Sequence, residues 1–466
     1  MELRTTANAF DLFDTLICRR ALVPQRVFED VERALGAANF SEIRVSAEQA
    51  LRQRGQQFDL HDIYREMVSR GNCSVDDAEK LKAAEIDAEF DHAAPVQENL
   101  NRVREFDLVV SDMYLPADVL RRLLQHVGLR VFVHLFVSTS GKHDGSIWPH
   151  LGKRWVIQRH LGDNLHADVE SPGRHGIAAE HYTGTQLSQP EELLANHGQT
   201  ELAGIMRAVR LQNPYPTDSV EAQLWLLQSQ LNLPLLCLGA VAIRRTQLQN
   251  NYSRVLFSAR DCYFLSEVFS LLFPAVASDY VYVSRHALWH DRENVDAMLD
   301  VRDPRHALVV DIASTGYSWL QFAETQKREI NFFTVVHIDR HIPVRVTSEQ
   351  LTTSRYLHFS YLLQSSTLTD YSNAIEVLNT APHASMQTFD RYVNLLVPEF
   401  APKHELAGGH VAAQVAAHAA ALKLLRKGRT RLLEEMPKAL PTALLQTLAQ
   451  TISVQPLLIE LGRSFV

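Results

Sequence analysis

The chain has 466 residues, a length that predicts about three domains or two large ones. Hydrophobic residues make up 46% and charged residues 21%, a globular composition that excludes a mainly disordered or collagen-like chain. With 46 Lys and Arg against 54 Asp and Glu, the formal net charge is −8. This balance argues against a nucleic-acid partner, because phosphate backbones require clustered positive charge.

The cysteines and the apolar stretches indicate the compartment. The four cysteines are widely separated and form no C-x-x-C pair, which argues against a disulfide scaffold or a structural zinc site and fits a reducing compartment. The first residues contain no apolar core of a secretory signal. The most apolar stretch, 231–243, is interrupted by Asn232 and Pro234 and is too short to cross a bilayer. We therefore expect a cytoplasmic protein without a transmembrane segment.

The first predicted element is a short apolar strand over 9–13, which runs into Asp14 and Thr15. From 20 to 100, apolar residues recur with the period of a helix, as at Val27, Phe28 and Val31, and no strand-like run interrupts them. We expect an all-helical insertion there. The chain then alternates again, with a strand over 106–110, a helix over 116–127, a strand over 131–137 and a helix over 147–160. This alternation predicts a parallel α/β sheet.

The second half of the chain shows the same alternation. A polar, turn-rich segment within 186–215 is expected to be a linker, and helices are expected over 221–249. The predicted strands that follow cover 255–258, 280–284, 307–311 and 332–338. The last part, 406–466, is rich in Ala and Leu and is expected to be a helical tail. A second α/β domain is therefore expected over 216–405.

Several polar residues of the first half follow predicted strands or stand in Gly-containing loops: Asp11, Thr15, Ser111, Lys142, Asp163 and Asp168. The carboxyl ends of parallel strands share one edge of a sheet, where ligands bind. A nucleophilic carboxylate, hydroxyl donors, a lysine and a carboxylate pair are the groups that phosphoryl transfer needs. Mg²⁺ takes a few carboxylates and keeps several waters, so it is the expected cofactor.

These residues stand in four ordered strings that resemble the motifs of the haloacid dehalogenase (HAD) superfamily: FDLFDTL, SDMYLP, GKHDGSIW and GDNLHAD. The resemblance implies a Rossmann-like core over 1–19 and 101–185, with a helical cap over 20–100. It implies that Asp11 is the nucleophile and that Thr15, Ser111 and Lys142 are catalytic. It further implies that Asp11, Asp163 and Asp168 hold Mg²⁺ together with the main-chain carbonyl of Phe13.

Position 13 is Phe in this chain, whereas the phosphatases of this superfamily carry a second Asp at the matching position, where it acts as general acid and base. An apolar ring neither protonates a leaving oxygen nor activates water. Asp14, one residue further along the chain, is an alternative general acid, but its side chain leaves the backbone in another direction. The chain is also similar to large bacterial HAD proteins with an extra C-terminal region, often predicted hydrolases accompanying surface-polysaccharide genes, in which Phe at this position is usual. A degenerate scaffold, retained for binding or architecture, is the other interpretation.

A second set of residues follows the strands of the second domain: Arg260, Asp261, Arg285, Asp311, Ser314, Thr315 and Gly316. The string from Asp311 to Ser318 is similar to the phosphoribosyl-diphosphate loop of phosphoribosyltransferases, where small residues cradle a phosphate at a helix N-terminus. A strand-to-helix turn with capping residues is the alternative interpretation. Arg260 and Arg285 are candidate anion ligands, with surface ion pairs as the alternative.

The expected function is that of a Mg²⁺-dependent HAD-type hydrolase or phosphotransferase, acting on a phosphorylated small molecule through an aspartyl-phosphate on Asp11. Two alternatives remain. One is a transferase activity, phosphoribosyltransferase-like or related to glycosyltransferases, in the C-terminal domain. The other is a non-catalytic scaffold that binds phosphate. The substrate and the oligomeric state do not follow from the sequence.

Overall fold

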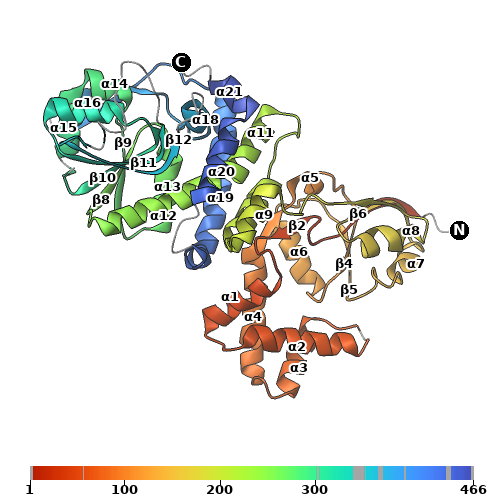
Figure 1. The fold of residues 1–466 in the computed structure, drawn as a ribbon. Helices are drawn as coiled ribbons and strands as arrows, with labels where there is room; N and C mark the ends of the chain where they lie inside the picture. The colour runs from red at the N-terminus through yellow and green to blue at the C-terminus, as the bar shows by residue number, and fades with distance from the viewer. Residues whose placement is uncertain are drawn as a thin grey trace. The chain divides into compact units, whose positions relative to one another are not determined.

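The computed structural model describes residues 4–55, 57–300, 302–303, 305–338, 351, 353–365, 371–392, 395–436 and 442–462. The chain divides into two compact units, Met1–Pro214 and Tyr215–Val466 (Figure 1). Each unit contains a five-stranded sheet of parallel strands together with helices. The expectation of an α/β protein with parallel sheets is therefore confirmed.

The sheet of the first unit has the order β5-β4-β1-β6-β7. Its strands are β1 (Thr5–Phe10), β4 (Leu108–Asp112), β5 (His134–Ser138), β6 (Trp155–Gly162) and β7 (Ala178–His181). Phe10 of β1 pairs with Val109 and with Leu161, so β1, β4 and β6 end at the same edge. Apolar side chains are buried on both faces, as expected for a parallel sheet that is covered on both sides.

Two expectations for this sheet were wrong. The strand expected over 9–13 lies instead at Thr5–Phe10, so Asp11 follows it rather than standing within it. The helix expected over 147–160 ends early, because α7 covers only Ile147–Leu151, and Trp155–Gly162 forms strand β6. Trp155, Val156 and Ile157 are aromatic and β-branched residues, which favour strands. Pairing with β1 along almost the whole length of β6 outweighs the helical pattern. The correction matters because Asp163 directly follows this strand.

The insertion between β1 and β4 contains α1 (Gln25–Leu35), α2 (Phe40–Gln53), α3 (Leu60–Ser69) and α4 (Val75–His92). Arg44 and Glu85, both fully buried, join α2 to α4 with a separation of 2.8 Å, and the Tyr64 hydroxyl donates to Glu85 over 2.7 Å. The insertion is not purely helical, because β3 (Ala93–Pro95) pairs with β2 (Ile17–Arg19) in an antiparallel ribbon. This ribbon joins the helices to the end of β1, beside the helices α5 (Gln97–Leu100) and α6 (Ala117–His126).

The linker expected over 186–215 is instead structured. Helices α9 (Gln189–Asn196) and α10 (Thr200–Leu211) occupy it, and nearly every residue of α10 is buried. Arg207 donates to the main-chain carbonyls of Arg19 and Ala21, which fixes α10 against the ribbon. Several polar residues of this segment therefore form hydrogen bonds and ion pairs with buried groups instead of facing solvent. The division between the two units falls between residues 214 and 215.

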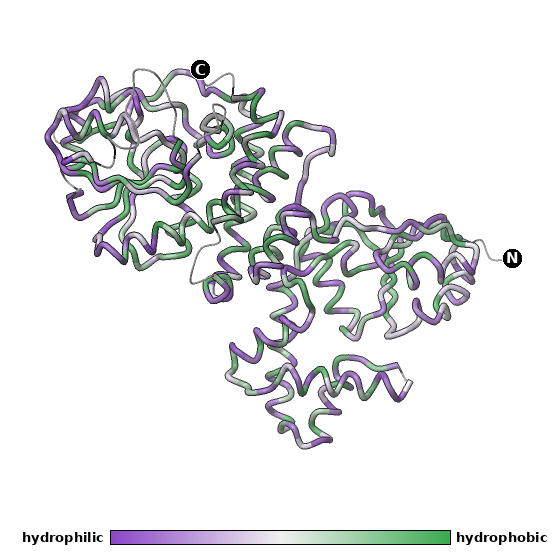
Figure 2. Tube along the Cα trace, in the orientation of Figure 1, coloured by the Kyte–Doolittle hydropathy of each residue, from purple (hydrophilic) through white to green (hydrophobic). Residues whose placement is uncertain are grey.

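The sheet of the second unit has the order β12-β11-β10-β8-β9. Its strands are β8 (Arg254–Ser258), β9 (Ala277–Val281), β10 (Ala307–Ser314), β11 (Ile330–Ile338) and β12 (Leu357–Ser365). Three predicted strands are confirmed, and the one expected over 280–284 lies instead at β9. Strand β12 and the hairpin of β13 (Met386–Tyr392) and β14 (Leu395–Phe400) were not predicted. Figure 2 shows that the central strands of this sheet are mainly hydrophobic.

The helices of the second unit surround its sheet. They are α11 (Val220–Leu227), η2 (Gln228–Asn232), α12 (Leu233–Gln249), α13 (Tyr263–Leu272), α14 (Arg285–His290), α15 (Arg292–Asp300), α16 (Tyr317–Gln326), α18 (Tyr371–Leu378), α19 (Gly408–Glu435), α20 (Thr442–Ser453) and α21 (Pro456–Gly462). The last three confirm a helical tail within the described residues. Among those residues, only Val220–Gln249 is long and apolar enough to cross a membrane, and 83% of its apolar window is buried inside the protein. That burial is typical of a core helix.

We predict that Gly204→Ala destabilises the first unit by about 1–3 kcal/mol, because overpacking a tight contact is costly. An added Cβ at Gly204 would lie 2.0 Å from the main-chain oxygen of Arg20, which cannot rotate away as a side chain would. Gly173→Ala is the matched control, since nothing lies within 4 Å of its added Cβ. Chemical denaturation of both variants checks the prediction, and equal stabilities would contradict it.

Candidate functional site

The predicted site residues of the first half lie at the carboxyl edge of the first sheet. Asp11 directly follows β1, and Ser111 stands near the end of β4. Asp163 directly follows β6, and Asp168 lies on the short helix η1 (Leu165–Glu170) behind it. Lys142 stands in the loop that follows β5. Parallel pairing therefore brings residues that are distant in sequence to one edge.

Lys142 joins two of the carboxylates. Its Nζ donates to Oδ1 of Asp11, and it donates to Oδ1 of Asp168 over 2.7 Å. All three side chains are buried, with Lys142 only 3% exposed. Attraction by the two carboxylates outweighs burial and raises the pKa of Lys142, so the lysine is a fixed positive charge.

Asp163 completes a group of three carboxylates. One oxygen each of Asp11, Asp163 and Asp168 lies within 4.8 Å of the others, and no other group of this kind occurs among the described residues. Three ionised carboxylates against one ammonium leave a net charge of −2 in a largely buried site. Carboxylate oxygens are the ligands that Mg²⁺ prefers. The donor set and its charge therefore fit one divalent cation.

The acidities of these groups reflect the shortage of positive charge. Burial, reinforced by Asp168 and Asp163 against the opposing Lys142, raises the pKa of Asp11 to about 8. Burial, together with the charges of Asp14 and Asp168, raises the pKa of Asp163 to about 6. Asp168 behaves in the opposite way, since hydrogen bonds and charges of His160 and Lys142 outweigh burial and lower its pKa to about 2.

The fold holds Asp168 from several sides. The fully buried His160 lies 2.8 Å from its Oδ1, and the main-chain N–H of Asn164 donates to its Oδ2 over 3.1 Å. Burial lowers the pKa of His160, so its ring is neutral and donates to the carboxylate. Gly162 leaves the space that Asp168 occupies, because a Cβ there would lie 2.3 Å from the Asp168 carboxyl carbon.

The backbone of Lys142 is held equally closely. Its N–H donates to Asp112 over 3.0 Å, and the Ser171 hydroxyl donates to its carbonyl over 2.6 Å. The Asp112 carboxylate also accepts from the N–H of His143 and from the hydroxyl of Ser138, so it organises the whole loop. These contacts direct the lysine side chain toward the carboxylates.

Thr15 and Ser111 supply hydroxyl groups at the same edge, and both are buried. Within the described part of the chain, the Thr15 hydroxyl finds no hydrogen-bond partner. Its carbonyl accepts from the amide of Asn99 over 2.9 Å, which fixes the loop. A buried hydroxyl without a partner is costly unless a ligand satisfies it.

Position 13 carries no titratable group, as the sequence indicates. The Arg19 guanidinium lies 4.0 Å from the centre of the Phe13 ring and is also bonded to Glu89 over 2.8 Å. Asp14 adopts the left-handed conformation with φ of 57°, which Asp tolerates better than most residues. Its charge acts on Asp163, so the Asp14 carboxylate lies near the site.

The sequence analysis missed three residues of this site. His160 was not predicted because a helix was expected over 147–160. The segment is in fact strand β6, which places His160 beside Ala9 of β1. Asp112 could have been predicted from the sequence, because it directly follows Ser111 at the end of a predicted strand and carries a carboxylate. Ser171 had no signal, because its contact with Lys142 arises only from tertiary packing.

The second predicted set lies in the second unit, separate from these groups. Arg260 and Asp261 follow β8, Asp311 lies within β10, and Arg285 begins α14. Ser314 ends β10, and Thr315 and Gly316 lead into α16. Arg260 pairs with Glu405 over 2.6 Å, and the charges of Asp261, Arg285 and Asp311 act on one another. The structure thus brings the charged members of this set together.

Comparison of the chain with protein-family models and with curated protein sequences finds no match.

We predict that stabilisation by Mg²⁺ grows as the pH rises from about 5 to about 8. Without metal, Asp163 and Asp11 have folded-state pKa values raised from 3.8 to about 6 and about 8. Their protonated forms favour folding at low pH, and this contribution is lost as the pH rises through those values. Metal binding needs ionised carboxylates and compensates at the high-pH end. The increase in Tm on adding Mg²⁺, measured across this range, checks the prediction.

Asp163→Asn should reduce this pH-dependent increase, whereas the exposed Asp118→Asn on α6 should leave it unchanged. An increase in Tm of the same size at both ends of the pH range would contradict the prediction.

Proposed function

We propose that the first unit is a Mg²⁺-dependent phosphohydrolase or phosphotransferase of the HAD type, with Asp11 as its nucleophile. The observation that carries the proposal is the buried group of three carboxylates within 4.8 Å of one another, two of them bonded to Lys142. The proposed substrate class is a phosphorylated small molecule, because the site is charged and largely buried.

Each side chain has a role that its contacts support. Asp11, Asp163 and Asp168 would hold Mg²⁺ together with the Phe13 carbonyl. Lys142 orients Asp11, and its charge favours the ionised form of that carboxylate. The unpartnered Thr15 hydroxyl and the buried Ser111 are suited to donate to phosphoryl oxygens. A bound divalent cation supplies charge neutralisation between the Asp11 carboxylate and the phosphate oxygens. These roles match the motifs that the sequence resembles.

In the proposed reaction, a carboxylate oxygen of Asp11 forms a bond to phosphorus while the bond to the leaving oxygen breaks. The oxygen of water or of an acceptor hydroxyl then bonds to phosphorus as the bond to Asp11 breaks, and its proton passes to solvent because Phe13 cannot accept it. Lys142 donates its hydrogen bonds to the carboxylates throughout and holds the geometry. His160 and Asp112 act as positioning residues, because they fix Asp168 and the Lys142 backbone.

Phe13 restricts the substrates that this site can process. An oxygen leaving as an alkoxide needs a proton, and the ring at position 13 supplies none. Leaving groups that are stable as anions, such as phenolates, carboxylates or phosphates, depart without that proton. The proposed enzyme therefore favours phosphoryl compounds with acidic leaving groups over simple alkyl phosphates.

The helical insertion is proposed to be a cap over this site. Gln57, between α2 and α3, accepts from the N–H of Thr139 over 2.7 Å, and its amide donates to Ser140 over 2.9 Å. Thr139 and Ser140 belong to the loop that carries Lys142. A cap that contacts the catalytic loop directly is suited to couple closure to positioning of the lysine.

We predict that Asp11→Asn abolishes Mg²⁺-dependent release of phosphate from p-nitrophenyl phosphate, lowering kcat by roughly a thousandfold or more, because the nucleophile is lost. A phosphate-release assay on the full chain, with and without chelator, measures this. Asp118→Asn, an exposed carboxylate on α6, is the matched control and should retain full activity. Wild-type protein without activity on a broad panel of phosphate esters would contradict the enzymatic proposal and leave the binding scaffold.

We predict that Phe13→Asp raises activity on alkyl phosphates relative to aryl phosphates, by about tenfold or more, since general acid catalysis contributes about a hundredfold or more in enzymes. The measured quantity is the ratio of kcat/KM for an alkyl and an aryl phosphate. Phe13→Leu controls for loss of the ring and of its contact with Arg19. An unchanged ratio in Phe13→Asp would show that position 13 does not set the leaving-group requirement.

A further inference from the structure

A cavity of about 550 Å³ opens on the sheet of the first unit, between β1, β6 and the loop that precedes β4. Its floor is apolar and includes the buried side chains of Phe10 and Leu161, which pair with each other across β1 and β6. Its polar lining residues are Asn8, Asn101, Arg102, Arg104, Gln158 and Arg159. An apolar floor with a few convergent polar groups is typical of small-molecule sites, whose volumes span roughly 300–1,000 Å³.

The loop before β4 forms one wall of this cavity. Strand β4 starts at Leu108, which lies beside Ala9, so Asn8 has no strand neighbour on that side. The N–H of Asn8 donates instead to the Asp107 carboxylate over 2.9 Å, and the second oxygen of this carboxylate accepts from the N–H of Arg104 over 2.9 Å. One buried carboxylate therefore fixes the backbone of two lining residues.

A bulge in β6 forms the opposite wall. The pairing of β1 with β6 shifts by one residue between Ala7 and Ala9, so Gln158 and Arg159 stand together opposite Asn8. Side chains normally alternate between the faces of a strand, yet these two neighbours are both exposed and both line the cavity. Bulges redirect side chains in this way. Within the described part of the chain, the side-chain amides of Asn8 and Gln158 have no hydrogen-bond partner.

Two of the three arginines are held in place by one carboxylate. Glu180 on β7 accepts from both terminal nitrogens of Arg102, over 3.0 and 2.9 Å, and from Arg159 over 3.1 Å. The guanidinium group of Arg104 has no partner among the described residues. The cavity is thus lined by one unpaired guanidinium group and by two others whose N–H groups are only partly used.

The charges of the lining determine the kind of ligand. Three guanidinium groups and no carboxylate line the cavity. The neighbouring acids lie behind this lining and are bonded there: Glu180 to two of the arginines, Asp107 to main-chain N–H groups, and Glu98 to the Tyr182 hydroxyl. Guanidinium groups bind carboxylate and phosphate groups through paired N–H donors. Because the cavity is larger than one such group, an organic molecule with several anionic groups fits it best.

We propose that this cavity binds a small organic anion that carries two or more carboxylate or phosphate groups. Arg104 and Arg159 donate to these groups, the amides of Asn8 and Gln158 donate to further oxygens, and the Phe10 ring contacts the apolar part of the ligand. Binding needs no metal ion, because positive charge is already present in the lining. The site uses none of the side chains proposed for phosphoryl transfer, so it does not depend on that proposal.

Calorimetric titration of the full chain tests the proposal, with chelator present and at an ionic strength of about 0.15 M. Citrate is the probe for carboxylate groups, and fructose 1,6-bisphosphate is the probe for phosphate groups. We expect at least one probe to bind with a Kd below about 1 mM. Arg104→Gln and Arg159→Gln should each weaken this binding by about tenfold or more, as loss of a charge-assisted contact does.

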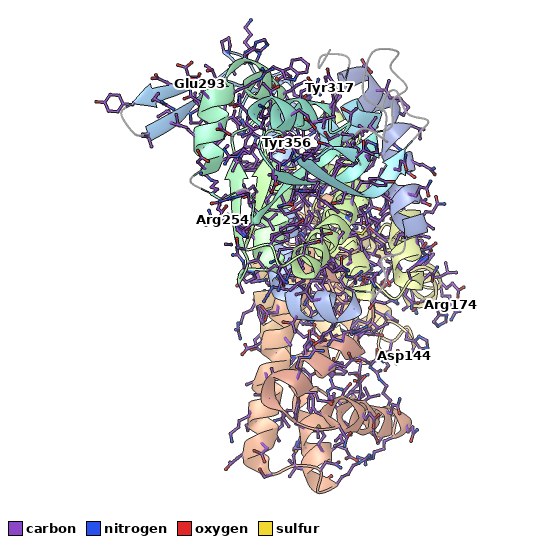
Figure 3. All side chains as sticks on the ribbon, turned by 60° about the vertical axis from the view of Figure 1, so that its left-hand side comes forward. Asp144, Arg174, Arg254, Glu293, Tyr317 and Tyr356 are labelled. Carbon is purple, nitrogen blue, oxygen red and sulfur yellow. The ribbon has the colours of Figure 1, made fainter. Side chains whose placement is uncertain are left out.

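Arg174→Gln is the matched control. Arg174 follows α8 (Ser171–Gly173), and Figure 3 shows it at the surface of the first unit. Its side chain is 65% exposed and pairs with Glu170, much as that of Arg159 is 60% exposed and pairs with Glu180, but it does not line the cavity. This variant should bind the probe as tightly as the parent.

The probe that binds more tightly decides between a carboxylate and a phosphate ligand. Absence of binding of both probes to the parent, or equal affinities in the parent and in the two cavity variants, would overturn the proposal. An equal loss of affinity in Arg174→Gln and in the cavity variants would show that overall charge determines binding, and would also overturn it.

Discussion

The contact of one buried lysine with two buried carboxylates organises the first unit. Lys142 reaches Asp11 and Asp168, which follow different parts of the sheet, and it is itself held by Asp112 and Ser171. Burial of three carboxylates is unfavourable with a single compensating charge. Lys142, His160 and the main-chain N–H of Asn164 donate hydrogen bonds to Asp11 and Asp168, and a divalent cation would balance the remaining charge.

Parallel strands explain why charged residues collect at one edge in both units. In a parallel sheet all strands end on the same side, so residues that follow the strands meet there, whatever their separation in sequence. In the first unit this edge carries three acids and a lysine that are tightly connected. In the second unit it carries more widely spaced acids and arginines. The three acids of the first unit are close enough for their oxygens to share one metal ion, whereas the acids of the second unit form no such group among the described residues.

The helical insertion depends on a different kind of interaction. Its helices are joined by the buried pair of Arg44 and Glu85, with the Tyr64 hydroxyl completing the carboxylate. The short ribbon of β2 and β3 joins it to the sheet, and Gln57 contacts the Lys142 loop. The apolar side chains of these helices also share one core with those of the sheet and of α6, so apolar packing holds the insertion in place as well.

The sequence by itself determined the α/β class and most of the helical insertion, because apolar periodicity is a local signal. Its ordered motifs also grouped Asp11, Lys142, Asp163 and Asp168, although Asp163 was expected to follow a helix rather than a strand. Only the tertiary structure decided that Trp155–Gly162 is a strand, that most of 186–215 is helical, and that His160 contacts Asp168. Pairing with β1 and burial of α10 outweighed local preference in the first two cases. The partners of His160 are set by which elements pack together, and that information is distributed over many parts of the chain.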